Sequence, residues 1–338
     1  MRSAVTGGAG FIGSHLVEHL LGLGDDVVVL DDLSTGSPDN LGRVLDDPHL
    51  EFVQGSVLDR PVVERVAGAT DRVFHLAAAV GVRLIVERPL SSLRTNVRGT
   101  ENVLEAVHQT GSTLLLASTS EVYGKNTANA LAEDADRILG SPFVSRWSYA
   151  AAKGIDESFA HGYWREYGTP VATVRLFNTV GPRQTGRYGM VLPNFVGQAL
   201  CGAPLTVFGD GLQTRCFSSV GDVVPAMVAL AAEPRAVGRA VNLGGAEEVR
   251  IIDLARRVIE VLGSSSRIEF VPYERAYGEG FEDMRRRVPD NGLARELVGF
   301  DPATSLDDMI LGVAEPMVDG GAADETMVVA GSSPGSAA

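Results

Sequence analysis

The sequence predicts an α/β protein with a doubly wound parallel sheet and a smaller lobe toward the C-terminus. Short apolar runs alternate with helical patterns up to about residue 178, as expected for consecutive β-α-β units. Glycines 7, 10 and 13 lie directly between the first apolar run and the first helical pattern. Beyond residue 178 the alternation weakens and arginines appear among glycines and turn residues, so we expect a second lobe there.

Composition places the chain among ordinary globular proteins. It has 338 residues, 45% of them hydrophobic and 21% charged, enough for one large or two medium domains. The net charge of −14 disfavours a nucleic-acid partner, because such surfaces need a basic stripe. No apolar run approaches the roughly 20 residues that span a bilayer, and no signal peptide precedes the first strand, so we expect a soluble cytoplasmic protein without a membrane partner. Cys201 and Cys216 show neither disulfide nor metal spacing, so we expect no metal site and two small residues in or near the core.

The first β-α unit has the pattern of a dinucleotide site. A strand is expected over residues 2–6 and a helix from Ser14 to about Leu23, with G-x-x-G-x-x-G between them. Such a loop lets the backbone approach a pyrophosphate, and the helix N-terminus offers N–H groups and partial positive charge. These features predict a Rossmann-type nucleotide-binding half.

The next strand ends at a pair of carboxylates. Asp31 follows the apolar run 27–30, where an acidic side chain binds the adenosine ribose hydroxyls. A 2′-phosphate would meet the charges of Asp31 and Asp32, so we expect NAD rather than NADP. The alternative, that Asp31 only starts a turn, explains less of the pattern.

Later units extend the same site. Strands are expected at residues 51–53 and 73–79, a long helix at 89–109 and a fifth strand at 113–117. Asp59 would lie beside the adenine or cap a helix, and His75 is expected to be a packed residue. The full set of expected cofactor contacts is Gly7, Gly10, Phe11, Ile12, Gly13, Asp31, Asp32, Ser34, Thr35, Gly36, Ser56, Val57, Leu76, Ala77, Ala78, Asn96, Tyr149 and Lys153.

Chemistry is expected just beyond the fifth strand, because ligands of open parallel sheets bind outside the carboxyl ends of strands. The polar run 118–124 lies there. Tyr149 and Lys153 are one helical turn apart, so they share a helix face, with three alanines between them. A nearby ammonium favours the phenolate of a tyrosine and would make it a base. Read alone, the pair could also be an ordinary amphipathic turn.

The chain after residue 178 is expected to bind the substrate. We expect residues 1–178 to form the nucleotide-binding domain, with some later segments returning to it, and residues 179–315 to form mainly the second lobe. Arginines suit diphosphate recognition, although any single one could be a solvated surface charge. Residues 319–338 are rich in Gly, Ala and Ser and read as a disordered tail.

Together these motifs resemble the extended short-chain dehydrogenase/reductases that modify nucleotide sugars, and most of all the UDP-glucuronic acid decarboxylases. Seven stretches carry the resemblance: 7–15, 118–124, 149–153, 177–183, 193–195, 209–215 and 282–290. Thr119-Ser120-Glu121 discriminates within the superfamily, since the epimerases usually have small hydroxyl residues there and the 4,6-dehydratases have Asp before the Glu. The chain departs from the decarboxylase pattern at 186–191 and in the loop 125–147.

The resemblance implies a mechanism with NAD as cofactor and UDP-glucuronic acid as substrate. Tyr149 as phenolate takes the proton of the sugar 4-hydroxyl while hydride leaves carbon 4, and carbon dioxide is then lost from the β-keto acid. Glu121 would repel the substrate carboxylate and then orient a water. The product is UDP-xylose or a released UDP-4-keto-pentose. The implied catalytic residues are Thr119, Glu121, Tyr149, Lys153 and Arg215, and the implied substrate contacts are Asn178, Arg187, Asn194, Phe195, Thr206, Phe208, Gln213, Arg215 and Arg287.

Relatives also use the two helices that begin near residues 89 and 149 to form a homodimer, which we expect here. Two alternatives remain open from the sequence. One is a sugar-nucleotide 4-epimerase or 4,6-dehydratase, and the other is a non-catalytic NAD-binding scaffold protein.

Overall fold

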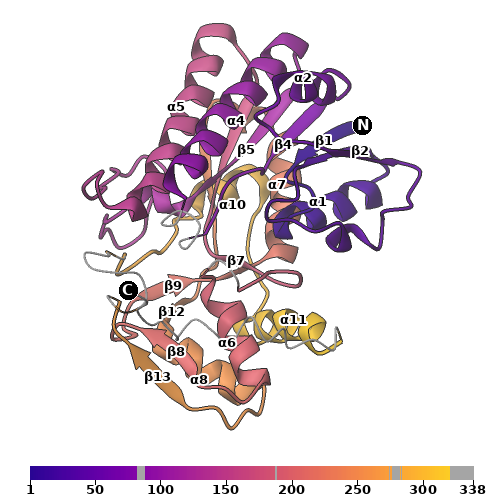
Figure 1. The fold of residues 1–338 in the computed structure, drawn as a ribbon. Coiled ribbons are helices and arrows are strands. Elements are labelled where there is room, and N and C mark those ends of the chain that lie inside the picture. The colour runs from indigo at the N-terminus through magenta and orange to yellow at the C-terminus, as the bar shows by residue number, and fades with distance from the viewer. Residues whose placement is uncertain (82–87, 187–188, 274, 276–281, 283, 320–338) are drawn as a thin grey trace, which may run out of the picture.

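A seven-stranded, fully parallel sheet is the centre of the protein (Figure 1). The computed structural model describes residues 1–81, 88–186, 189–273, 275, 282 and 284–319. The strand order β11-β6-β5-β4-β1-β2-β3 contains the doubly wound order 3-2-1-4-5-6, extended by one late strand. The strands are β1 (Arg2–Thr6), β2 (Asp26–Asp31), β3 (Leu50–Gln54), β4 (Arg72–His75), β5 (Thr113–Thr119), β6 (Val171–Leu176) and β11 (Ala240–Leu243).

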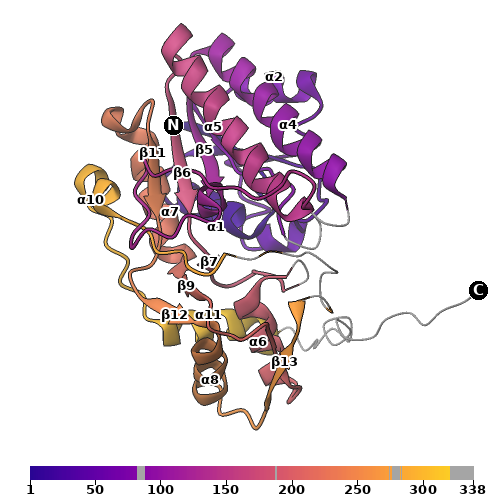
Figure 2. The same ribbon diagram turned by 90° about the vertical axis from the view of Figure 1, so that its left-hand side faces the viewer.

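Helices cover both faces of this sheet (Figure 2). On one face lie α2 (Arg60–Gly68), α4 (Pro89–Thr110) and α5 (Ser148–Tyr167), and on the other lie α1 (Phe11–Gly22), α7 (Val220–Ala232) and α10 (Gly292–Val298). The position of β2 in the sheet explains its continuously apolar sequence. Val27 and Val29 face the α1/α7 layer, whereas Val28 and Leu30 face the α2/α4 layer. A strand buried on both faces has no polar side to expose.

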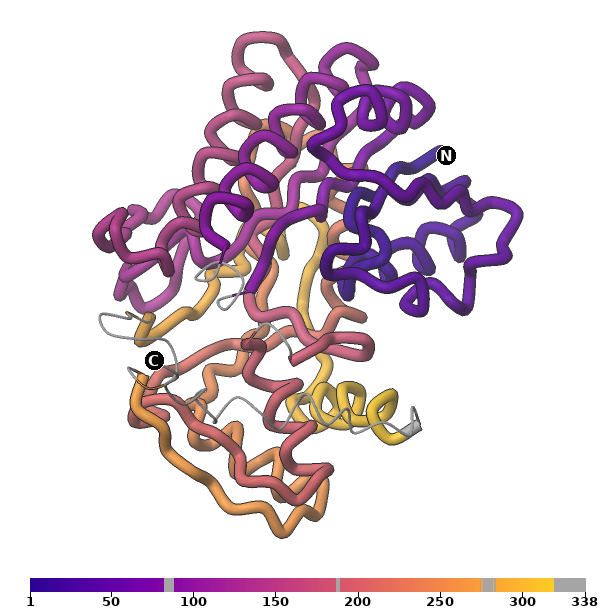
Figure 3. The backbone as a smooth tube through the Cα atoms, in the orientation of Figure 1, coloured from indigo at the N-terminus to yellow at the C-terminus, as the bar shows by residue number. Residues whose placement is uncertain are grey.

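A second lobe lies below the sheet and has its own core. Its helices are α6 (Val191–Leu200), α8 (Ile251–Val261) and α11 (Leu306–Asp319). Its strands pair as β7 (Thr179–Val180) with β10 (Ser218–Ser219), β8 (Leu205–Phe208) with β13 (Ile268–Val271), and β9 (Thr214–Cys216) with β12 (Glu248–Arg250). The backbone tube shows the chain passing between lobe and sheet several times, because α7, β11 and α10 return to the sheet (Figure 3).

The predicted elements agree with the structure in the sheet and differ at some ends. The strand at 2–6 has the expected bounds, and the expected strands 51–53 and 113–117 lie within β3 and β5. Helix α1 begins at Phe11 rather than Ser14, and β4 stops at His75, so residues 76–79 form no strand. Cys216 is buried as expected, but Cys201, the C-cap residue that follows α6, is exposed. Apart from Asp319 at the end of α11, the predicted tail lies outside the described residues.

Within the described residues, no helix is long and apolar enough to cross a membrane.

Candidate active site

The glycine loop between β1 and α1 is closed too tightly to hold side chains. A Cβ on Gly13 would lie 2.1 Å from the carbonyl oxygen of Gly7, and a Cβ on Gly7, whose φ is +74°, would lie 2.8 Å from the backbone nitrogen of Ala77. Helix α1 follows with no side-chain cap and no acidic residue in its first turn. The first N–H groups of a helix have no partner within the helix. The N–H groups of Phe11, Ile12 and Gly13 therefore form a cradle that fits the pyrophosphate of a dinucleotide.

Asp31, at the end of β2, lies next to this cradle. Its carboxylate is buried and accepts hydrogen bonds from the backbone N–H of Ala9 (2.9 Å) and of Leu33 (2.8 Å). Burial raises the pKa of Asp31, and those two N–H groups oppose the increase. The exposed Asp32 accepts a hydrogen bond from the backbone N–H of Ser34. A Cβ on Gly36 would lie 2.8 Å from the backbone of Ala9, so this turn packs directly on the glycine loop.

The remaining predicted cofactor residues surround the end of β4. Asn96 is fully buried in α4 and bonds both backbone groups of Ala79, accepting from its N–H (2.8 Å) and donating to its oxygen (3.3 Å). It therefore holds the segment of Leu76, Ala77 and Ala78 in place. Val57 is buried, and Ser56 accepts a hydrogen bond from the N–H of Leu58. The structure thus brings these residues to the ends of β2, β3 and β4, and their contacts with NAD stay predictions, as does that of Thr35.

His75 is a packed histidine, as expected. Its ring nitrogens bond the hydroxyls of Thr6 (2.7 Å) and Thr100 (3.1 Å). Burial, with the positive charge of Lys153, lowers its pKa to about 3. The neutral imidazole therefore links β1 to α4 through these two hydrogen bonds and has a structural role.

Tyr149 and Lys153 lie in the first part of α5, and both are buried. Lys153 Nζ donates to the carbonyl oxygen of Ala117 (3.0 Å) and lies 3.3 Å from Asp156 Oδ2. The pKa of Tyr149 is raised overall, and the effect of Lys153 on it stays a prediction. Burial raises the pKa of Tyr149, the charges of Glu121 and Asp156 raise it further, and a hydrogen bond with Thr119 opposes them. Among these side chains by themselves, the phenol therefore keeps its proton at neutral pH.

Thr119 and Glu121 lie at the end of β5 and in the 3₁₀ turn η2 (Ser120–Tyr123). Thr119 Oγ1 accepts a hydrogen bond from the backbone N–H of Glu121 (3.2 Å), so one hydroxyl joins this turn to the phenol of Tyr149. The carboxylate of Glu121 contacts both terminal nitrogens of Arg146 and lies 3.5 Å from Nη1 of Arg287. Although burial raises the pKa of Glu121, the arginines outweigh it and lower that pKa to about 2.

Sequence reasoning missed Arg146. It lies in the short turn η3 (Ser145–Trp147), directly before α5, and only 3% of it is exposed. The sequence does contain one signal. A cation just before a helix N-terminus is repelled by the helix dipole. Such a cation therefore suggests a carboxylate nearby that offsets the repulsion.

The three consecutive arginines 285–287 have different partners, and Arg287 is the one that lies beside Glu121. Arg285 pairs with Asp210 on the surface, and Arg286 pairs with Glu248. Arg287 is buried, donates to Oδ1 of Asn178 (3.1 Å) and contacts Glu121, so it lies beside the catalytic candidates. Its assignment to a phosphate stays a prediction.

The other predicted substrate contacts lie in the second lobe. Phe195 is 1% exposed, so its ring belongs to the core of the lobe. Thr206 accepts a hydrogen bond from the side chain of Gln198, and Gln213 donates to the carbonyl oxygen of Phe208. Arg215 is buried, and its charge contributes to the lowered pKa of Glu121. Asn194 lies against Gly186, and Arg187 lies outside the described residues.

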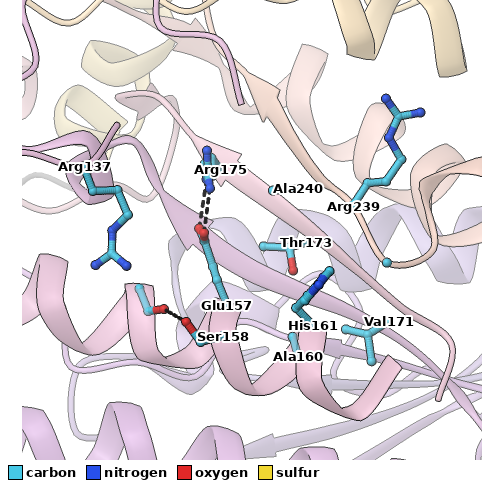
Figure 4. Close-up of a pocket in the computed structure, with 12 residues that line it drawn as sticks. Arg137, Glu157, Ser158, Ala160, His161, Val171, Thr173, Arg175, Arg239 and Ala240 are labelled. Carbon is cyan, nitrogen blue, oxygen red and sulfur yellow. Dashed lines mark hydrogen bonds and ion pairs between the residues drawn. The ribbon is translucent and has the colours of Figure 1, made fainter. Parts of the chain in front are cut away.

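A separate cavity of about 390 Å³ lies on the other side of α5, against β6 and β11 (Figure 4). None of Thr119, Glu121, Tyr149 or Lys153 lines it. Glu157 crosses from α5 to Arg175 of β6 through two hydrogen bonds, and it also accepts one from Ser118 (2.5 Å). This buried pair fixes α5 on the sheet behind the site.

The fold and the site define the class. A doubly wound sheet that holds a dinucleotide cradle beside a Tyr-x-x-x-Lys turn is the arrangement of an extended short-chain dehydrogenase/reductase. The chain belongs to the NAD dependent epimerase/dehydratase family, whose model matches residues 3–244, and its cofactor is NAD.

Individual relatives narrow the likeness. The chain is 39% identical over 305 residues to a UDP-N-acetyl-alpha-D-glucosaminuronate decarboxylase of Bacillus cytotoxicus, covering 90% of this chain and 94% of the relative. It is 38% identical over 306 residues to UDP-glucuronic acid decarboxylase 1 of Arabidopsis thaliana, covering 90% and 67% respectively. Its fold is similar to the structure of a UDP-glucuronic acid 4-epimerase from Bacillus cereus in complex with UDP-glucuronic acid and NAD. That match has a TM-score of 0.85 and 28% identity, and covers 94% of this chain and 99% of the other.

Proposed function

We propose that this protein is an NAD-dependent decarboxylase of UDP-glucuronic acid. The observation that carries the proposal is the position of Glu121, whose carboxylate contacts Arg146 and Arg287 beside the Thr119–Tyr149 pair. The names of the relatives support it, since the two reported at 38–39% identity are both decarboxylases of a UDP-linked hexuronate.

The first half of the reaction is oxidation of the sugar at carbon 4. Tyr149 must be the phenolate for this step, and the positively charged nicotinamide ring of bound NAD would favour that form, as would the Lys153 ammonium. Its Oη then accepts the proton of the 4-hydroxyl, and the Thr119 hydroxyl holds the same oxygen in place. NAD, when bound in the Gly7–Gly13 cradle, supplies the acceptor for the hydride of carbon 4. Lys153 fixes α5 to the end of β5 through the carbonyl of Ala117, which keeps Tyr149 at the strand end.

The second half breaks the bond between carbon 5 and the carboxylate. The electron pair of that bond moves onto carbon 5 and the carbon 4 oxygen as an enolate, and carbon dioxide leaves. Tyr149, now a phenol with a raised pKa, donates a hydrogen bond to the enolate oxygen together with Thr119. Carbon 5 is then protonated by a water that Glu121 orients.

Arg146 and Arg287 contact Glu121, so they reduce the repulsion that it would exert on the substrate carboxylate. That this repulsion drives the loss of carbon dioxide stays a prediction. We propose that either UDP-xylose or a UDP-4-keto-pentose is the product.

A second candidate substrate is UDP-N-acetylglucosaminuronate, which the Bacillus cytotoxicus relative favours by its name and coverage. The chemistry at carbons 4, 5 and 6 is the same for both sugars, and the difference lies at carbon 2. Comparing kcat/KM for the two substrates decides between them.

The deciding experiment is incubation of the pure protein with NAD and UDP-glucuronate carrying ¹³C in the carboxyl group. We expect labelled carbon dioxide and a UDP-pentose by mass. A UDP-hexuronate of unchanged mass but inverted carbon 4 would instead indicate an epimerase, and a dehydrated sugar product a dehydratase. If neither UDP-hexuronate is altered although NAD binds, the non-catalytic scaffold is the correct reading.

We also propose a cytoplasmic homodimer built on α4 and α5. These helices lie side by side on one face, and each carries an exposed apolar residue, Leu90 at 60% and Ile155 at 46%. The two free cysteines suit a reducing compartment. Light scattering at micromolar concentration should give about twice 35.7 kDa. A monomer there would contradict the assembly.

A further inference from the structure

Arg146 is a buried cation in an unfavourable place. It lies directly before the N-terminus of α5, where the helix dipole repels positive charge, and only 3% of it is exposed. A buried charge needs a partner, and Glu121 supplies one: Nη1 contacts Oε2 and Nη2 lies 3.0 Å from Oε1. A planar guanidinium bound through two parallel contacts fixes the plane of the carboxylate as well as its position.

The rest of the surroundings explains why orientation matters. Glu121 also faces Arg287 at 3.5 Å, Arg215 from β9 and the phenol of Tyr149. A carboxylate among these groups could rotate between several cationic partners. Arg146 is the only one of them, among the described contacts, that engages both oxygens of Glu121.

We propose that Arg146 is a positioning residue for the decarboxylation half of the cycle, holding Glu121 as a fixed, ionised carboxylate that orients a water rather than donating a proton itself. This rests on the proposed function. The lowered pKa of Glu121 agrees with it, because a carboxyl that stays ionised at neutral pH cannot be the acid that protonates carbon 5.

The first test reads Glu121 directly and does not depend on any reaction. Carboxyl ¹³C NMR of glutamate-labelled protein is followed over about pH 5–8, just above the reference glutamate pKa of about 4.3, and Glu121→Gln assigns the signal. In the unmodified protein the signal should not titrate. In Arg146→Gln the Glu121 signal should titrate within about pH 5–8. Burial raises the pKa of Glu121, and the variant lacks the Arg146 charge that opposes this increase. Arg165→Gln, which removes an exposed arginine in the last turn of α5, should leave the signal unchanged. A non-titrating signal in Arg146→Gln overturns the proposal.

The second test separates positioning from a purely structural ion pair. With UDP-glucuronate, Arg146→Gln should slow carbon dioxide release roughly 10²-fold, at the low end for lost acid–base help, while NAD reduction on mixing changes much less. Arg146→Lys keeps the charge without the planar fork and should recover only part of the rate. In a Glu121→Gln background, Arg146→Gln should add little, because its partner is already gone. An equal fall in both half-reactions, or a full additive effect in the double variant, contradicts the role. If the unmodified protein releases no carbon dioxide, the proposed function fails, and the NMR result still decides whether Arg146 controls Glu121.

Discussion

Arg146 and Glu121 are 25 residues apart in the chain, yet they meet through two nitrogen–oxygen contacts beside the end of β5. Glu121 follows a strand and Arg146 precedes a helix, so the sheet and α5 together bring the pair into contact. A lone carboxylate would repel the carboxylate of a bound hexuronate. Arg146 offsets the charge of Glu121 and holds its carboxylate in one orientation.

Glu121→Gln should separate the two halves of the reaction. The amide keeps the size of the side chain but loses the charge that orients a water. We expect NAD reduction to persist on mixing with UDP-glucuronate, while carbon dioxide release falls by roughly 10²–10⁴-fold. Stopped-flow absorbance at 340 nm and trapped ¹³C-labelled carbon dioxide measure the two steps. Tyr149→Phe should stop both, since it removes the base and the enolate donor. Decarboxylation at the unmodified rate in Glu121→Gln would show that Glu121 has no such role.

Asp31→Ala should weaken NAD binding by about 1–3 kcal/mol, the scale for losing a hydrogen bond to a charged group. The gap between NAD and NADP should narrow, because a carboxylate that disfavours the 2′-phosphate is gone. Calorimetric titration measures both affinities. Asp46→Ala removes an exposed carboxylate elsewhere and should change neither. Equal affinity of the unmodified protein for NAD and NADP would refute the role of Asp31.

Two glycines of α1 should respond oppositely to alanine. A Cβ on Gly13 would lie 2.1 Å from the carbonyl oxygen of Gly7, so Gly13→Ala must distort the cradle, abolish NAD binding and lower the melting temperature. A Cβ on Gly22 meets nothing within 4 Å, so Gly22→Ala should stabilise the protein by about 0.5–1 kcal/mol through helix propensity. Thermal melts with and without NAD test the pair. Unchanged NAD stabilisation in Gly13→Ala would contradict the close packing of the loop.

A buried ion pair at the N-terminal edge of the sheet should make stability depend on acid. Arg72 Nη2 lies 2.6 Å from Asp25 Oδ2, and both side chains are 7% exposed. Burial raises the pKa of Asp25, but hydrogen bonds from Arg72, Ser3 and the N-terminus lower it overall. Because the folded pKa is depressed, this stabilisation is complete above the unfolded value of about 3.9 and is lost as pH falls through the folded value.

Asp25→Asn should therefore cost about 3–5 kcal/mol at pH 7, because it leaves Arg72 buried without its partner. The variant should also lose part of the acid dependence. Urea unfolding at several pH values measures both effects. Asp26→Asn is the matched control, since that neighbour is 62% exposed and pairs with an exposed His49, so about 0–1 kcal/mol is expected. Equal losses in both variants would contradict the assignment to the buried pair.

The sheet and the cofactor half could be predicted from sequence because their signals are local. The apolar run 27–30 of β2 is buried on both faces, and the glycine loop with Asp31 spans one β-α-β unit. Positions such as Thr119, Tyr149 and Lys153 follow from strand ends and helical spacing, which a few neighbouring residues determine.

The sequence by itself therefore determined the doubly wound fold, the dinucleotide cradle and the residues at the end of β5. The tertiary structure alone decided which charges meet there. Arg146, which sequence reasoning missed, forms a close ion pair with Glu121. Arg287 lies against Glu121 and Asn178, whereas Arg285 and Arg286 pair with carboxylates elsewhere. Burial raises the pKa of Tyr149. The strength of an ion pair and the pKa of a side chain depend on distance and burial in the folded protein. Residues 121, 146 and 287 are far apart in the chain, so no local sequence pattern predicts their distances or their burial.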